Sequence, residues 1–171
     1  MNKIWENIFK LRQKAVDEID AILLKIPVFQ DLNKRELKKI KRILHQREYS
    51  SNEIIFKEGD IGLGMYIILA GEVQIVCGPD NHVLAELCRG DFFGELSLLD
   101  DAPRSAAALA KLPSVTLCFF KPELIDLISR DPQLGCKILF RLAWVIGERL
   151  KSTNEQLKKI SCLREQDPLS A

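Results

Sequence analysis

Residues 89–106 read RGDFFGELSLLDDAPRSA, and this stretch carries the strongest structural signals in the chain. An apolar run ends before Gly90, and Gly94 precedes the helix-forming run 95–99. The first turn of a helix has backbone N–H groups without intrahelical partners, and these groups suit a phosphate. The stretch therefore predicts the end of a strand, a tight turn, a helix of one to two turns and a second strand from Arg104.

Two charged side chains of this stretch narrow the kind of ligand. Arg104 offers a permanent positive charge and a fork of donors that fits two phosphate oxygens. Glu95 only accepts hydrogen bonds, so beside an anion it suits a hydroxyl such as that of a ribose. A nucleoside triphosphate is not expected, because the chain has no GxxxxGK[ST] motif. Two alternatives stay open: Glu95 as an acidic residue that stabilises a helix start, and Arg104 as the partner of Asp100 or Asp101.

Short apolar or alternating runs lie on both sides of this stretch, separated by turn residues such as those at 78–81. Several short strands at this spacing are typical of a β-sandwich or barrel. We expect strands at residues 53–56, 65–69, 72–77, 83–87, 105–111 and 115–120.

Helices are predicted at both ends of the strand region. Apolar residues recur in three- and four-residue steps from Asn2 to Leu24, which indicates an amphipathic helix that ends before Pro27. Asn33 followed by Glu36 predicts a capped basic helix over 34–44. Two further helices are expected near the C-terminus, one with Pro122 in its first turn and one from Pro132 to about Cys162.

Residues 93–106 resemble the phosphate-binding cassette of cyclic-nucleotide-binding domains, and residues 59–73 resemble the glycine-bracketed strand pair of that family. The resemblance runs from about Val28 to Leu157. It implies a mainly β fold, a double-stranded β-helix (jelly-roll) barrel with N-terminal helices and a long C-terminal helix. It divides the chain into an N-terminal amphipathic helix (1–27), a cyclic-nucleotide-binding domain that includes the C-terminal helix (28–162), and a flexible tail (163–171).

The resemblance also implies which residues bind the ligand. In the family, backbone amides and the arginine hold the cyclic phosphate, the glutamate takes the ribose hydroxyl, and a residue of the C-terminal helix covers the base. A threonine next to the arginine favours cGMP in this family, and Ser105 stands there, so we expect cAMP rather than cGMP. The expected ligand-binding residues are Phe93, Gly94, Glu95, Leu96, Ser97, Arg104, Ser105, Ala106, Thr153 and Asn154. An alternative for Thr153 and Asn154 is that they are polar positions in a helical seam.

Composition excludes several classes of function. The chain has 25 basic and 24 acidic residues, so its charge points to neither a nucleic acid nor a membrane partner. We expect no signal peptide and no membrane span, and hence a cytoplasmic protein. The five cysteines form no CxxC pair, and His45 and His82 are dispersed, so we expect no metal site, no cofactor and no cupin-like enzyme.

The function that fits these expectations is a non-enzymatic regulatory module that binds a cyclic nucleotide and acts on an unidentified downstream protein. The alternative is the ligand-sensing part of a catabolite-activator-type transcription regulator. Such a regulator binds DNA through a helix-turn-helix, and the roughly ten residues after Ile160 are too few to form one, so this alternative applies if the chain is a fragment whose DNA-binding domain is missing.

The last predicted helix carries an apolar seam that approximates a heptad repeat. We expect this seam to support a homodimer through paired C-terminal helices, with packing against the N-terminal helix as the rival arrangement. Its positions are Leu139, Leu142, Ile146, Leu150, Thr153, Leu157 and Ile160.

Overall fold

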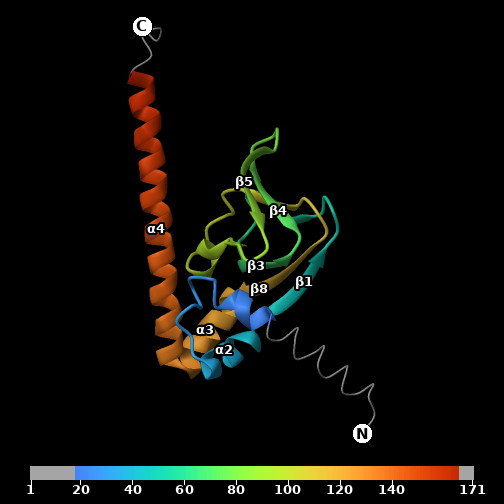
Figure 1. The fold of residues 1–171 in the computed structure, drawn as a ribbon, viewed down its shortest axis with the longest axis vertical. Helices are drawn as coiled ribbons and strands as arrows, with labels where there is room; N and C mark the ends of the chain where they lie inside the picture. Colours follow the sequence, from blue (N-terminus) through green and yellow to red (C-terminus); the bar gives the residue numbers. More distant parts are fainter. Residues whose placement is uncertain (1–17, 166–171) are drawn as a thin grey trace.

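The computed structural model describes residues 18–165, in which eight strands form two antiparallel sheets (Figure 1). The sheets have the strand orders β1-β8-β3-β6 and β2-β7-β4-β5. This arrangement, with helices at both ends, confirms the predicted jelly-roll fold. The strands are β1 (His45–Tyr49), β2 (Ile54–Phe56), β3 (Gly64–Ala70), β4 (Glu72–Cys77), β5 (His82–Cys88), β6 (Phe92–Phe93), β7 (Ala107–Ala110) and β8 (Ser114–Phe120).

Two of these strands were not predicted from the sequence. β1 reads HQREY and is mostly exposed, so it lacks the apolar alternation of a half-buried strand. It forms because it pairs along its whole length with β8, from His45 opposite Cys118 to Tyr49 opposite Ser114. β6 contains only two residues, and it pairs with Tyr66 and Ile67 of β3.

The helices follow the sequence signals, except that the basic helix predicted over 34–44 ends at Lys41. Residues 18–23 are helical, and this helix ends before Pro27; residues 1–17 of the predicted N-terminal helix lie outside the described residues. Helix α2 (Lys34–Lys41) begins with the predicted capping box, in which the Asn33 side chain accepts from the backbone N–H of Glu36 at 3.0 Å. Helices α3 (Lys121–Arg130) and α4 (Pro132–Glu165) follow β8, and α4 extends three residues past the predicted end at Cys162.

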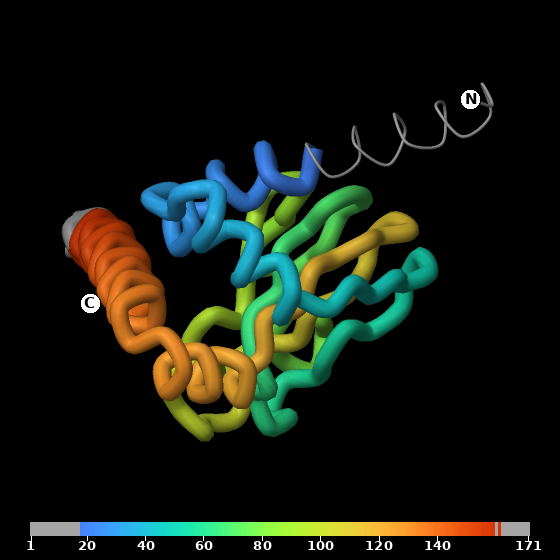
Figure 2. The backbone as a smooth tube through the Cα atoms, turned by 90° about the horizontal axis from the view of Figure 1, so that it is seen from below, coloured from blue at the N-terminus to red at the C-terminus, as the bar shows by residue number. Residues whose placement is uncertain are grey.

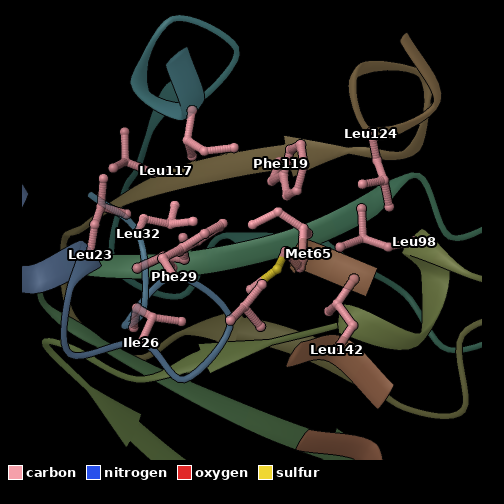
Figure 3. Close-up of a cluster of buried hydrophobic side chains, with 14 of the residues drawn as sticks. Leu23, Ile26, Phe29, Leu32, Met65, Leu98, Leu117, Phe119, Leu124 and Leu142 are labelled. Atoms are coloured by element: carbon pink, nitrogen blue, oxygen red, sulfur yellow. The ribbon is translucent and has the colours of Figure 1, made fainter. Parts of the chain in front are cut away.

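The main core lies between the sheet β1-β8-β3-β6 and the helices (Figure 3). Phe29 packs against Phe119 of β8 with ring centroids 6.1 Å apart. Met65 of β3, Leu124 of α3 and Leu142 of α4 complete this core. A second cluster combines β3 and β6 with β4, β7 and β8 and so fills the space between the two sheets; its residues are Tyr66, Ile68, Val73, Phe93, Ala108 and Cys118.

Helix α4 packs on the domain only along its first half. Its buried residues follow three- and four-residue steps: Leu134, Ile138, Leu142 and Val145. Gly135 allows the start of α4 to approach α3 closely, because a Cβ at this position would lie 2.7 Å from Ile128 Cα. From Glu148 to Lys159 the residues are exposed, and in Figure 1 the helix stands beside the barrel and ends beyond the β4–β5 hairpin.

Seen along its own axis in Figure 2, α4 stands outside the strands, and α3 joins it to the barrel. The predicted seam therefore divides into two parts. Leu142 belongs to the core, whereas Leu150 and Leu157 are exposed; the side chain of Ile160 lies outside the described residues. Among residues 18–165, no helix has the length and apolar character that a membrane crossing requires.

Candidate functional site

A pocket of about 460 Å³ lies at the predicted cassette. It is bounded on one side by the cassette and on the other by apolar side chains of β2, β4 and β5, with one arginine of α4 at its edge. The cassette residues that line it are Phe93, Gly94, Glu95, Leu96, Ser97, Arg104, Ser105 and Ala106, together with Asp100, Ala102 and Pro103. The structure thus brings together all the predicted binding residues of segment 93–106.

Gly94 makes the turn that begins the pocket wall. Its φ of 74° lies in the left-handed region, where a residue with a side chain is strained, and it precedes the 3-10 helix η1 (Glu95–Leu98). A Cβ at this position would also lie 2.6 Å from Arg104 Nη1. Glycine is therefore needed here both for the backbone conformation and for the close approach of the arginine.

The Arg104 side chain is held in place by two backbone carbonyls and an aromatic ring. The residue is 7% exposed, and its guanidinium donates to Gly94 O at 3.0 Å and to Gly64 O at 2.7 Å. Its Cζ lies 4.1 Å from the centroid of the Phe56 ring, which is a cation–π contact. Burial lowers the pKa of the Arg104 guanidinium from its ordinary value, although an arginine stays charged at neutral pH. Its Nε atom is buried and has no partner among the described residues.

The alternative partners of Arg104 are engaged differently. Asp101 Oδ1 pairs with Lys121 Nζ at 2.7 Å, and the carbonyl of Asp100 accepts from the same ammonium at 3.1 Å. The two side-chain hydrogen bonds of Arg104 go to backbone carbonyls instead. The alternative in which Arg104 serves as a surface ion-pair partner of these aspartates is therefore wrong.

Glu95 is 4% exposed, and its two oxygens have different environments. Oε1 accepts from Arg149 Nη1 of α4 at 2.7 Å, whereas Oε2 is buried without a partner among the described residues. Arg149 also donates to Phe92 O at 3.1 Å and stacks on the Phe92 ring, with its Cζ 4.7 Å from the centroid. One side chain of α4 is thereby fixed at the edge of the pocket.

Sequence reasoning did not identify Arg149 as a site residue. A usable signal was present, because Arg149 lies four residues after Val145 and so shares the face of the predicted helix that carries its apolar stripe. The predicted residues Thr153 and Asn154 are exposed on α4 and do not line this pocket. The Thr153 hydroxyl donates to Arg149 O of its own helix at 2.9 Å. Their contact with a base stays a prediction.

The pocket combines one unpaired donor, one unpaired acceptor and an apolar wall. Buried polar groups in proteins are nearly always paired, so Arg104 Nε and Glu95 Oε2 fit a ligand that offers both an acceptor and a hydroxyl. The wall suits a flat apolar group, and it consists of Phe56, Ile75, Ala85 and Leu87. Among residues 18–165, no three His, Cys, Asp or Glu side chains are grouped so that they could hold a metal ion.

Comparison with known proteins identifies the family of this chain. Residues 46–131 match the family described as "Cyclic nucleotide-binding domain". The chain is 31% identical over 138 residues to the cyclic AMP receptor protein of Thermus thermophilus, covering 79% of this chain and 62% of that protein. It is 36% identical over 107 residues to a cAMP-dependent protein kinase regulatory subunit of Colletotrichum orbiculare, covering 63% of this chain and 26% of that protein.

A solved structure shares most of the fold. A cyclic nucleotide-binding domain from Methylobacillus flagellatus superimposes with a TM-score of 0.72 at 29% identity, covering 85% of this chain and 84% of that one. The chain spans less than two thirds of the length of the two curated relatives above. From the matched residues and the geometry of the pocket, the chain belongs to the family of cyclic nucleotide-binding domains.

Proposed function

We propose that this chain is a regulatory module that binds a cyclic nucleotide, cAMP in preference to cGMP, and acts on a downstream protein through α3 and α4. The observation that carries the proposal is that Arg104 and Glu95 line the same pocket. Each has one buried polar atom that lacks a hydrogen-bond partner among the described residues. A cyclic nucleotide has one phosphate charge and one free ribose hydroxyl, which match this pair.

Each residue of the cassette has a role in this proposal. Arg104 binds the cyclic phosphate, and backbone N–H groups at the start of η1 and near Ser105 and Ala106 add further donors. Glu95 accepts from the ribose hydroxyl through Oε2 while its other oxygen keeps the bond to Arg149. Arg149 offsets the negative charge of Glu95, which otherwise lies buried beside the anionic ligand.

The preference for cAMP rests on the residue beside the arginine and on the relatives. Ser105 stands where a threonine would favour cGMP, and the apolar wall formed by Ile75, Ala85 and Leu87 offers no side-chain hydrogen bond to a base edge. Both curated relatives described above are named for cAMP. Thr153 and Asn154 lie one turn beyond Arg149 on α4, and in this proposal one of them covers the base.

The same proposal includes a homodimer through α4. Leu150 is 59% exposed and Leu157 is 56% exposed, and both lie in the second half of α4. A two-fold pairing of this helix with a second copy would bury both leucines. The rival arrangement, with the N-terminal segment covering these leucines, involves residues outside the described range.

Calorimetric titration tests the function directly. Purified protein is titrated separately with cAMP, cGMP and a cyclic dinucleotide under one buffer and salt condition. We expect saturable binding of both mononucleotides, tighter for cAMP, and no comparable binding of the dinucleotide. Tighter binding of cGMP would reverse the proposed preference, and absence of binding to either mononucleotide would refute the proposed function.

A further inference from the structure

Lys121, the first residue of α3, contacts two segments at the phosphate end of the pocket. Its backbone N–H donates to Leu63 O at 2.9 Å. Its ammonium donates to Asp100 O at 3.1 Å and pairs with Asp101 Oδ1 at 2.7 Å. Asp100 itself lines the pocket. The start of α3 is therefore bound both to the loop before β3 and to the end of the cassette.

The loop before β3, residues 57–63, and Gly64 at the start of β3 are in turn bound to the phosphate-binding arginine. Gly59 N donates to Arg104 O and Arg104 N donates to Asp60 O, both at 2.8 Å. Arg104 Nη2 donates to Gly64 O at 2.7 Å. Gly64 directly follows Leu63, whose carbonyl accepts from the backbone N–H of Lys121. These bonds link the guanidinium to the start of α3 through a short, continuous stretch of backbone.

Of the two contacts that the Lys121 ammonium makes, the hydrogen bond to Asp100 O matters more for the position of the cassette. The side chain of Asp101 is 89% exposed and that of Lys121 is 22% exposed. An exposed ion pair changes an equilibrium by less than about fivefold, because water screens it. A backbone carbonyl, by contrast, is fixed in the chain, so the bond to Asp100 O sets the position of residues 99–103 relative to α3.

We infer that Lys121 is a positioning residue that holds the cassette against α3 and couples occupancy of the phosphate site to the stability of α3. The inference rests on the proposed function. When a phosphate draws η1 and Arg104 onto itself, the segment that follows η1 moves with them, and Lys121 conveys that change to α3. The inference requires the Lys121 contact to be stronger in the ligand-bound state, and removing it then weakens ligand binding by that difference alone.

The test compares the wild type with Lys121→Ala, Lys121→Arg and a matched control, Lys137→Ala. Lys137 pairs with Glu36 at 3.0 Å, so it also joins two helices, but it does not line the pocket or contact the cassette. Calorimetry gives the affinity for cAMP, hydrogen exchange of residues 121–130 with and without cAMP gives the coupling, and thermal melts confirm that each variant folds.

We expect Lys121→Ala to bind cAMP about three- to tenfold more weakly than the wild type, since one bond to a charged donor is lost. The ligand-induced protection of residues 121–130 should fall, and Lys121→Arg should restore part of both effects. Lys137→Ala should match the wild type in both measurements. If the wild type binds cAMP and Lys121→Ala equals Lys137→Ala in affinity and protection, the role of Lys121 is refuted while the proposed function stands. If the wild type binds no cyclic nucleotide, the proposed function is refuted and this inference with it.

Discussion

Arg149 Nη1 lies 2.7 Å from Glu95 Oε1, so a side chain of the long helix α4 is bonded to a carboxylate inside the pocket. If Arg149 supports the ligand, as we propose, Arg149→Ala leaves Glu95 buried, unpaired and close to the anion. We expect cAMP to bind about tenfold or more weakly in this variant, measured by calorimetry. Lys151→Ala is the control, because Lys151 pairs with Glu148 on the same helix at 2.7 Å away from the pocket. Equal binding by Arg149→Ala would mean that Arg149 does not support the ligand, and tighter binding would mean that it obstructs the site.

Arg104→Ala should lower the affinity for cAMP below what titration can measure. A hydrogen bond to a charged group contributes about 1.5–3 kcal/mol, which corresponds to a loss of roughly ten- to 150-fold for one such bond. Arg104→Lys should also lose affinity, because a point charge cannot replace the fork of donors. Since Arg104 packs on Phe56, thermal melts must show that both variants are folded. Titration of Arg104→Ala close to that of the wild type would rule out the phosphate role.

Glu95→Gln should weaken the contact with the ribose and leave the phosphate contact in place. The wild type should bind cAMP more tightly than its 2′-deoxy analogue, by about tenfold for a hydroxyl bonded to a charged acceptor. In Glu95→Gln the two ligands should bind with more similar affinity, because a neutral amide is a weaker acceptor than a carboxylate. A wild type that does not distinguish the two ligands would reduce Glu95 to a residue that stabilises the start of η1.

Leu150→Glu should convert a dimer into a monomer. A charge at this exposed position of α4 would be buried in the proposed helix pair, where it lacks a partner. Sedimentation equilibrium at micromolar concentration, with and without cAMP, measures the change. Ser152→Glu adds the same charge on the opposite side of the helix and should leave the dimer intact. A wild type that is monomeric in both states contradicts the paired-helix proposal.

Asp131, at the junction of α3 and α4, should make the stability of the fold sensitive to acid. The side-chain bond from Lys39 Nζ at 2.6 Å, followed by the backbone N–H of Leu134, lowers the pKa of Asp131 from its ordinary value. A lowered pKa in the folded state gives stability above the unfolded pKa, and this is lost as pH falls through the folded pKa. Urea denaturation at low salt, at about pH 6 and about pH 3, should therefore show a smaller acid-induced loss of unfolding free energy in Asp131→Asn than in the wild type. Lys39→Ala removes the main cause but keeps the Leu134 bond, so its loss should lie between those of Asp131→Asn and the wild type. Identical losses in all three proteins would exclude this contribution.

The cassette could be predicted because several constrained residue types coincide in one segment. Gly94 needs a left-handed backbone, Arg104 needs a ligand or carbonyls for its donors, and both requirements are visible as residue types at fixed spacing. The strands with apolar alternation were also predictable. β1 was not, because its stability comes from pairing with β8 and not from its own pattern.

The rest of the site depends on contacts between distant segments. The bond between Arg149 and Glu95 joins residues 54 positions apart, and the carbonyl of Gly64 that receives Arg104 is 40 positions away. Local sequence patterns do not specify such pairs. The register of α4 relative to the pocket also depends on contacts between distant segments. For this reason Thr153 and Asn154 could be proposed from the resemblance, but their position relative to the pocket could not be predicted.

The length of α4 would amplify a small rotation at its start. Its 34 residues span roughly 50 Å at about 1.5 Å per residue, and Gly135 lies in close contact with Ile128 of α3 near the start of the helix, the position about which we propose that α4 turns. A rotation of roughly ten degrees about that position moves Arg149 by about 4 Å and the far end of the helix by about 8 Å. A displacement at the pocket that is no larger than one side chain is therefore doubled at the outer end, where a second molecule can detect it.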